Sequence, residues 1–420
     1  MPEQLILGPW TGAVTANSAT LKAFITKGAT ARLTLNAENG STAANPLPAT
    51  SRTAAGSNWE VVAFALAELQ PNVEYRYTLK LDNEPEAAQR GRFRTFPPPD
   101  TPASFTFICG GDAGGGFFSS NSNHEVFDVL RKEAALFFLH LGDMHYGDID
   151  EADVVKHLEG YRKTLRQSRQ AAFFRQFPFA YIWDDHDFCG NASNGQSPGC
   201  QAARLAYQVG IPHYKLEAGD GDVPIYQAFT IGRVRFLLTD TRSARIHRSA
   251  AEGPHKTILG AEQKAWLKDQ LLAGKDRYSL IVWVSSAPWL GGLQHFADNE
   301  DGWANYRTER AELGSFIEAE GIRNLLMLCA DAHMVAIDDG TFNRGKTGAG
   351  RFPIFHAAPL DRSNSRKGGE YSHGVFDDHR GQYGLVEIKD EGGQPAAQVK
   401  LIGKHMGSEL VSFPFTSPRP

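Results

Sequence analysis

The sequence predicts two domains, an all-β sandwich followed by an α/β domain. The chain has 420 residues, and single domains usually hold roughly 100–200 residues. Residues 1–97 contain short apolar runs with polar or glycine breaks, whereas residues 98–420 alternate apolar runs with helical patterns. The prolines at 97–99 predict a stiff linker, because proline fixes φ and favours an extended chain. We therefore place the domain boundary after residue 97.

Period-two alternation supports the first domain. Polar and non-polar residues alternate in 75–81, and residues 91–96 show a similar alternation, which is typical of strands with one buried and one wet face. Several such strands at regular spacing indicate a sandwich. Segment 69–75, Leu-Gln-Pro-Asn-Val-Glu-Tyr, resembles the corner before the penultimate strand of fibronectin type III domains. The expected strands are residues 5–8, 19–25, 31–35, 59–66, 73–81 and 89–96.

The second domain alternates strand and helix patterns, as an α/β layer architecture does. Its expected strands are residues 105–109, 135–141, 179–183, 233–239, 279–284 and 324–330, and its expected helices are 125–133, 261–272 and 307–318. Near the end, residues 385–389 and 398–402 flank Gly392-Gly393 and predict a closing hairpin.

Composition excludes several classes of protein. A net charge of −5 without a basic run argues against a nucleic-acid partner. No apolar stretch reaches the ~18–20 residues of a membrane span. The first residues carry no export signal, which predicts a cytoplasmic chain, with a mature form that has lost its leader as the alternative.

Four cysteines are too few for a disulfide scaffold in a chain of this length. Cys189 and Cys200 share one loop and could pair. Cys109 and Cys329 each end an apolar run, which predicts buried thiols that serve packing.

Acidic residues and histidines follow four of the predicted strands. Loops beyond strand ends converge on one crevice of an α/β sheet. One carboxylate there is usually a cap or turn residue, but four such ends predict a shared site. Carboxylates and imidazoles bind divalent and trivalent metals, and buried carboxylates repel one another unless cations lie among them. The residues are Asp112, Asp143, Asp184 to Asp187, Asp331 and His333.

These segments resemble the metallophosphoesterase superfamily, and more narrowly the PhoD-like alkaline phosphatases, with purple acid phosphatases as relatives. Tyr146 matches the tyrosine that ligates ferric iron in purple acid phosphatases. Each motif alone is weak, but the ordered set is specific and extends over nearly the whole chain. The matching motifs are Asp112-Ala113-Gly114, Gly142-Asp143, Asp184-Asp185-His186-Asp187 and Asp331-Ala332-His333.

One motif departs from the superfamily pattern. Residues 284–289, Val-Ser-Ser-Ala-Pro-Trp, have no histidine before the proline. One ligand of the second metal is therefore absent or supplied by another group.

The resemblance implies a fold of two packed mixed sheets flanked by helices behind the sandwich. It also implies two or more metal ions, with Fe³⁺ at the Tyr146 site and Ca²⁺ (or Zn²⁺ or Mn²⁺) at the second. Asp112, Asp143, Tyr146 and His333 would hold the first metal, and Asp143 would be shared with Asp185 and Asp331 on the second. A metal-bound hydroxide at this dinuclear site would hydrolyse phosphomonoesters or phosphodiesters.

Other side chains are assigned supporting roles. Together with Asp143, His186 is a catalytic candidate that would protonate the leaving alkoxide; the alternative is a structural histidine bonded to Asp184 or Asp187. Arg242, His124 and His145 are candidate substrate contacts. For Arg242 a surface ion pair is the alternative, since its planar fork suits carboxylates as well as phosphates. For Cys109 the resemblance implies an alternative to packing, because a cysteine near this point ligates iron in some PhoD-like enzymes.

Two further functions stay open. A phospholipase D-like or nucleotide phosphodiesterase could use the same site. A non-catalytic binding or adhesion protein is the alternative of another class, since β-sandwiches are common recognition modules. The expected partner is a small phosphate ester, and the oligomeric state is open.

Overall fold

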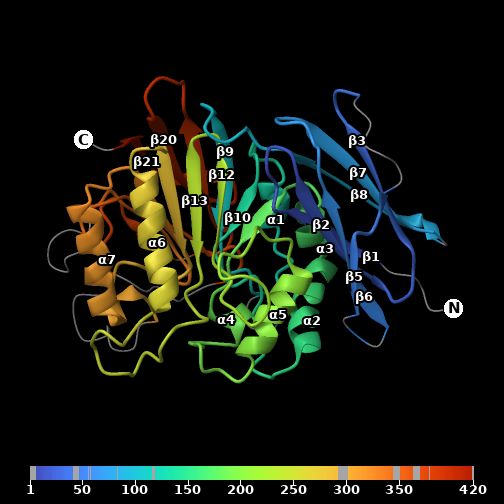
Figure 1. Ribbon diagram of the computed structural model, residues 1–420, viewed down its shortest axis with the longest axis horizontal. Coiled ribbons are helices and arrows are strands. Elements are labelled where there is room, and N and C mark those ends of the chain that lie inside the picture. Colours follow the sequence, from blue (N-terminus) through green and yellow to red (C-terminus); the bar gives the residue numbers. More distant parts are fainter. Residues whose placement is uncertain are drawn as a thin grey trace.

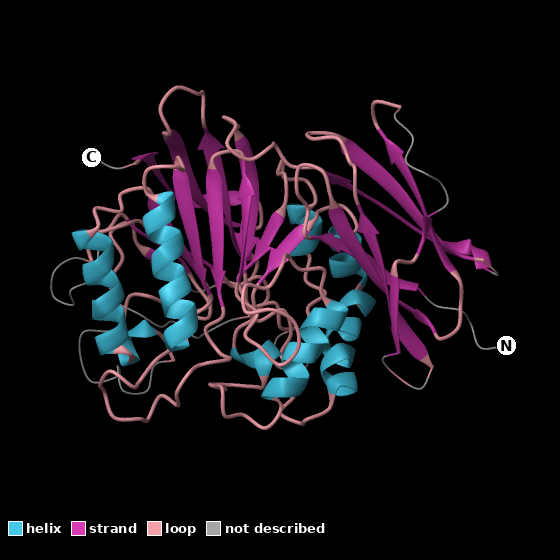
Figure 2. Ribbon diagram, in the orientation of Figure 1, coloured by secondary structure: helices cyan, strands magenta, loops and turns pink. Residues whose placement is uncertain are grey.

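The computed structural model describes residues 6–40, 47–54, 56, 58–82, 84–115, 119–291, 301–343, 351–362, 369–377 and 379–418. These residues form sheets of ten, seven and four strands, with helices on the outer faces (Figures 1 and 2).

The amino-terminal region is a β-sandwich. Strand β7 buries Tyr75, Tyr77, Leu79 and Leu81 and exposes the residues between them or leaves them half-buried, as its alternation predicts. The likeness to fibronectin type III domains stays a prediction. One layer is the four-stranded sheet, β4 (Leu47–Pro48), β3 (Ala31–Ala37), β7 (Glu74–Leu81) and β8 (Glu84–Arg94); the other is β1 (Ile6–Gly12), β2 (Ala19–Thr26), β6 (Trp59–Leu66) and β5 (Ser51–Ala54).

The sandwich shares a sheet with the rest of the molecule. Strand β1 pairs in parallel with β11 (Phe179–Tyr181) through Gly12 and Phe179. A Cβ on Gly12 would lie 2.4 Å from the Pro212 carbonyl oxygen and 2.8 Å from that of Phe179, so only glycine allows this approach. Because the ten-stranded sheet crosses residue 97, the domain boundary placed there stays a prediction.

Three short parallel strands form the centre of the ten-stranded sheet: β9 (Phe105–Gly110), β10 (Phe138–His140) and β11. An antiparallel meander, β19 (Gln382–Lys389), β20 (Ala397–His405) and β21 (Ser408–Ser417), completes the sheet beyond β9. The predicted closing hairpin is the pair β19–β20, in which Lys389 lies opposite Gln398.

The seven-stranded sheet packs face to face against this centre. The Phe236 ring of the seven-stranded sheet lies 5.4 Å from the Phe107 ring and 5.5 Å from the Phe137 ring, between the sheets. Both sheets mix parallel and antiparallel pairs, as expected. The strands, in spatial order, are β12 (Gln227–Ile231), β13 (Val234–Thr239), β14 (Leu280–Ser285), β15 (Leu325–Cys329), β17 (Ile354–Ala357), β16 (Val335–Asp338) and β18 (Val375–Phe376).

Helices flank both sheets (Figure 2). The predicted helices are present as α1 (Val126–Leu130), which is shorter than expected, α6 (Gly260–Gly274) and α7 (Arg307–Ala319). In the part of the chain that the structure describes, four helices and one 3₁₀ turn were not predicted: α2 (Val154–Arg166), α3 (Ser168–Phe174), α4 (Asp185–Phe188), α5 (Cys200–Gly210) and the turn η2 (Trp303–Asn305).

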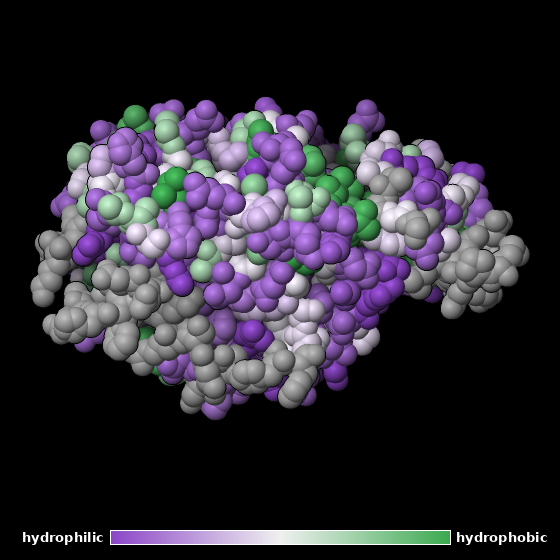
Figure 3. All heavy atoms as spheres, turned by 90° about the horizontal axis from the view of Figure 1, so that it is seen from below, coloured by the Kyte–Doolittle hydropathy of each residue, from purple (hydrophilic) through white to green (hydrophobic). Residues whose placement is uncertain are grey.

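Seen from the side on which α4 and α5 lie, the described surface is mostly hydrophilic, and apolar residues gather where the sandwich joins the larger body (Figure 3). All four cysteines are free, so Cys189 and Cys200 are not paired here. Among the described residues, no helix is long and apolar enough to cross a membrane.

Candidate metal centre

The acidic strand-end segments meet at one place between the two sheets. Asp112 follows β9, Asp143 follows β10, and Asp185 follows β11, while Asp331 follows β15 of the other sheet. All four side chains are buried. Since β9, β10 and β11 are parallel neighbours, their carboxyl ends open on the same edge.

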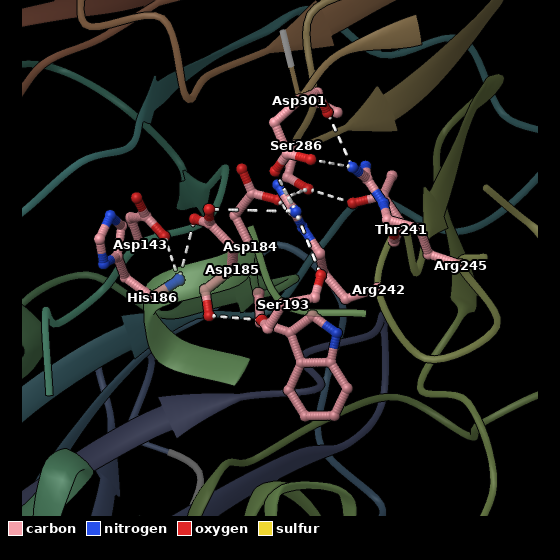
Figure 4. Close-up of polar contacts among 12 residues, drawn as sticks. Asp143, Asp184, Asp185, His186, Ser193, Thr241, Arg242, Arg245, Ser286 and Asp301 are labelled. Atoms are coloured by element: carbon pink, nitrogen blue, oxygen red, sulfur yellow. Dashed lines mark hydrogen bonds and ion pairs between the residues drawn. The ribbon is translucent and has the colours of Figure 1, made fainter. Parts of the chain in front are cut away.

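Two overlapping groups of ligand atoms form the centre. Ligand atoms of Asp143, Asp185 and His186 lie within 4.8 Å of one another, and so do those of Asp184, Asp185 and Asp331. The His186 backbone N–H donates to Asp143 Oδ1 at 3.2 Å and to Asp185 Oδ1 at 2.9 Å (Figure 4). Because Asp185 belongs to both groups, the two groups adjoin. The part played by Asp184 was not foreseen.

Tyr146 joins the centre beside His333. The two side chains are linked by a hydrogen bond of 3.1 Å between the phenol oxygen and Nε2. Burial raises the pKa of Tyr146, and the nearby charges of Asp143 and Asp112 raise it further. A Cβ on Gly114 would lie 2.4 Å from the Tyr146 ring. The glycine of the first motif therefore makes room for this tyrosine.

The first two strand-end loops are hydrogen-bonded to each other. The Asp112 N–H donates to the Gly142 carbonyl at 3.1 Å, and the Ala113 N–H donates to the Asp143 carbonyl at 2.8 Å. These bonds fix the separation of the two carboxylate-bearing loops.

The backbone at the centre is strained. Four of the predicted metal ligands have positive φ: Asp112 (58°), Asp143 (53°), Asp331 (70°) and His333 (43°). Each such residue costs of order 1–3 kcal/mol, and such strain clusters at functional sites. The surrounding packing therefore holds these side chains against the backbone's own preference.

The electrostatics favour bound cations. Burial raises the pKa of Asp143 well above its ordinary value, and repulsion from Asp185, Asp187 and Asp184 raises it further. Asp143 Oδ2 accepts no hydrogen bond from the described residues. Buried carboxylates that repel one another, together with a phenol and imidazoles, fit divalent and trivalent metal ions.

His186 is held by a residue that the sequence analysis missed. Its Nδ1 lies 2.5 Å from Asp148 Oδ1, so its partner is neither Asp184 nor Asp187. Burial lowers the pKa of His186, but the hydrogen bond to Asp148 and the charges of Asp185 and Asp148 outweigh burial, and the pKa is raised. Asp148 is five residues beyond Asp143 in the same loop, which is the signal that could have found it.

Asp187 connects two of the strand-end segments. It accepts hydrogen bonds from the Tyr181 hydroxyl at 2.5 Å and from the backbone N–H groups of Met144 and Asp184 at 2.7 Å each. Burial raises the pKa of Asp187 to about 7, although these three donors oppose the rise. The side chain thus fixes the loop after β10 to the start of α4.

Arg242 is neither on the surface nor open to a substrate. Its side chain is fully buried, and Nε donates to Asp184 Oδ1 at 2.6 Å (Figure 4). Nη1 pairs with Asp301, to which Arg245 Nη1 also donates at 2.6 Å. The surface ion pair considered for Arg242 is therefore wrong, and this buried position gives no support to a substrate contact. Asp301, missed as a site residue, lies two residues before the turn η2.

The other two predicted substrate contacts differ in position. His145 is buried with its ring 5.4 Å from the Tyr161 ring of α2, and burial lowers its pKa to about 3. The ring packs against α2 in this structure, and its contact with a substrate stays a prediction. His124 is half-buried beside Asp361, whose N–H donates to the Asp112 carbonyl at 3.0 Å. Its substrate contact stays a prediction.

Ser286 occupies the motif that lacks a histidine. Its hydroxyl donates to Asp184 Oδ1 at 2.9 Å and lies 2.6 Å from the Thr241 hydroxyl. The preceding Ser285 hydroxyl instead bonds the Ala287 carbonyl and accepts from Trp303 Nε1. Cys109 is buried in the core with a raised thiol pKa caused by burial, as its packing role predicts.

The fold and the acidic centre are those expected of a phosphoric ester hydrolase. The sequence model of a protein family described as "PhoD-like phosphatase" matches residues 113–369, more than half of the chain. The chain belongs to the PhoD-like phosphatase family, which confirms the expected class of enzyme at the level of the family.

The chain is also similar to a known alkaline phosphatase and, in fold, to a solved structure. Alkaline phosphatase D of Bacillus subtilis (strain 168) is 26% identical over 310 residues, which are 63% of this chain and 52% of the relative. The match thus spans about half the length of that relative. A solved structure titled "Structure of PhoD" superposes with a TM-score of 0.70 at 16% identity, over 96% of this chain and 91% of that one. The two chains share a fold that includes the amino-terminal sandwich.

Proposed function

We propose that this protein hydrolyses phosphomonoesters or phosphodiesters at a dinuclear metal centre. The observation that carries the proposal is the convergence of Asp112, Asp143, Asp185 and Asp331, all buried, from strand ends of two sheets. Membership of the PhoD-like phosphatase family supports the same activity.

We assign Asp112, Asp143, Tyr146 and His333 to the first cation, with Fe³⁺ proposed because of the phenol. Asp143 is shared with the second cation, which Asp185 and Asp331 also hold; Ca²⁺, Zn²⁺ or Mn²⁺ is proposed there. When bound, two cations would neutralise the phosphoryl oxygens and supply a nucleophile from water near neutral pH.

Side chains of the protein would then protonate the leaving alkoxide and contact the charged phosphoryl group. Asp148 engages Nδ1 of His186, which leaves Nε2 as the ring atom that can protonate the leaving alkoxide. Arg362, half-buried, has its guanidinium carbon 4.0 Å from the centroid of the Tyr146 ring. We therefore assign the contact with the substrate phosphoryl group to Arg362 in place of Arg242.

The test is a pair of assays, with an aryl phosphate and a bis-aryl phosphate, before and after removal of metals by a chelator. We expect hydrolysis that is lost with the metals and restored when they return. A nucleotide or phospholipid diesterase would prefer the bis-aryl ester, whereas a binding protein would hydrolyse neither. Tyr146→Phe should remove any violet iron–phenolate colour.

Asp143→Asn tests the centre itself. Because its carboxylate is shared by both proposed cations, we expect turnover to fall more than about 100-fold with metal content reduced. The control is Asp82→Asn, an exposed aspartate paired with Arg32 in the sandwich, which should change neither. Retention of turnover by Asp143→Asn would reject the site.

A further inference from the structure

We propose that Asp184 is a ligand of the second cation and takes the place of the histidine that is absent from the motif at residues 284–289. The inference rests on the dinuclear centre proposed above and adds one residue to it. Asp184 directly precedes Asp185, and a carboxylate oxygen of Asp184 lies within 4.8 Å of ligand oxygens of Asp185 and Asp331.

The two oxygens of Asp184 have different surroundings. Oδ1 accepts from Arg242 Nε at 2.6 Å and from the Ser286 hydroxyl at 2.9 Å (Figure 4). Oδ2 accepts no hydrogen bond from the described residues, although the side chain is only 1% exposed. A buried carboxylate oxygen without a donor is costly, and a cation among Asp184, Asp185 and Asp331 would satisfy it.

Ser286 lies in the segment that lacks the histidine, and it contacts the proposed ligand Asp184. Ser286 belongs to the segment in which the superfamily places a metal-binding histidine, directly after β14. Its side chain is too short to replace an imidazole, but it donates to Asp184 and lies 2.6 Å from the Thr241 hydroxyl. The segment therefore acts through Asp184, as a residue that orients a ligand.

Arg242 fixes the same carboxylate from another side. Its guanidinium is always charged and its planar fork can hold two carboxylates at once, here Asp184 and Asp301. Arg245 binds Asp301 in turn. This chain of buried ion pairs keeps one oxygen of Asp184 occupied and the carboxylate in one orientation.

The ligand set has a chemical consequence. With Asp184 included, the second cation would be surrounded by the carboxylates of Asp143, Asp184, Asp185 and Asp331 and by no ring nitrogen from residues 284–289. Oxygen-only sets suit hard cations such as Ca²⁺ and Mn²⁺ better than Zn²⁺. Ca²⁺ is therefore the probe for this site.

The experiment compares two neighbouring buried serines. Chelator-treated protein and its variants are titrated with Ca²⁺ by calorimetry, and metals per chain are counted by elemental analysis. Ser286→Ala removes a donor to Asp184 and should weaken Ca²⁺ binding about 10-fold. Ser285→Ala removes a hydroxyl bonded to Ala287 and Trp303 and should leave the affinity unchanged. Asp184→Asn should lose one cation per chain.

The outcomes separate this inference from the proposed function. Wild-type Ca²⁺ affinity in Ser286→Ala and in a folded Asp184→Asn overturns the role of Asp184, as does equal weakening by both serine variants. Should Asp184→Asn not fold, the serine pair decides alone. Hydrolysis that stays metal-dependent and is lost in Asp143→Asn keeps the proposed function even if Asp184 binds nothing.

Discussion

The strand ends of the two sheets contribute different chemistry to one centre. The central strands of the ten-stranded sheet end in carboxylates, Asp112, Asp143 and the Asp184-Asp185 pair. Strands β13 and β14 of the seven-stranded sheet are followed instead by Arg242 and Ser286, which both bind Asp184. The ten-stranded sheet thus supplies most of the carboxylates, whereas the seven-stranded sheet supplies Asp331 together with groups that hold Asp184 in place. The centre can form only when both sheets pack together.

The largest expected effect comes from removing the charge that compensates Asp184. Arg242→Met leaves Asp184 and Asp301 buried without their shared cation, so the free energy of unfolding should fall by about 3–5 kcal/mol. Urea unfolding of the metal-free protein measures the change. Arg242→Lys should recover little of the loss, because an ammonium group lacks the fork that reaches both carboxylates. Wild-type stability in Arg242→Met would mean that the seven-stranded sheet does not hold the carboxylates.

A smaller loss is expected within the ten-stranded sheet. The Asp187 carboxylate accepts from three donors, the Tyr181 hydroxyl and the Met144 and Asp184 N–H groups. In Asp187→Asn, the amide nitrogen would replace one carboxylate oxygen and would face these donors without being able to accept from them. The free energy of unfolding should fall by about 2–3 kcal/mol. Thermal and urea unfolding both report it. An unchanged midpoint would show that the loop after β10 is fixed by other contacts.

Sequence reasoning found the ligands because each motif is local. Asp112, Asp143, Asp185 and Asp331 each follow an apolar run that marks a buried strand, and parallel strands place such loops together. The central strands themselves were predicted for the same reason, although β10 is shorter than expected.

The parts that were missed depend on long-range contacts. Arg242 reaches Asp184 and Asp301, each almost 60 residues away, and neither pairing has a local pattern. His145 lies between Asp143 and Tyr146 in the sequence, yet its ring packs against α2, a helix that was not predicted. The strand pairing that joins the sandwich to the central sheet likewise depends on a long-range pair, Gly12 with Phe179.

A third change should affect turnover without affecting stability. Asp148→Asn removes the charge that orients His186 and keeps its pKa raised. Asp148 itself is half exposed, so its loss should leave the unfolding midpoint unchanged. We expect kcat to fall about 10-fold with KM little altered, because proton donation to the leaving group is affected more than binding. A fall in kcat/KM that comes from a higher KM, with kcat unchanged, would assign His186 to substrate binding instead.

A pH-dependent effect tests whether the sandwich and α5 pack together without water between them. Lys22 of β2 in the sandwich donates from Nζ to the Gln208 carbonyl of α5 at 2.6 Å, and burial lowers its pKa from 10.5 to about 7. Between these two values the folded chain has lost a proton that the unfolded chain still holds. The contribution of Lys22 to stability should therefore rise with pH by about 1 kcal/mol per pH unit from pH 7 upward, and show no slope below pH 7.

Lys22→Met isolates this contribution, because other groups titrate alike in both proteins. The difference in unfolding free energy, wild type minus variant, should increase from pH 7 to pH 9. The exposed Lys80→Met is the control and should give parallel curves. Parallel curves for Lys22→Met as well would show that water reaches the lysine. Water would then enter between the sandwich and α5, and the two would not pack as one unit.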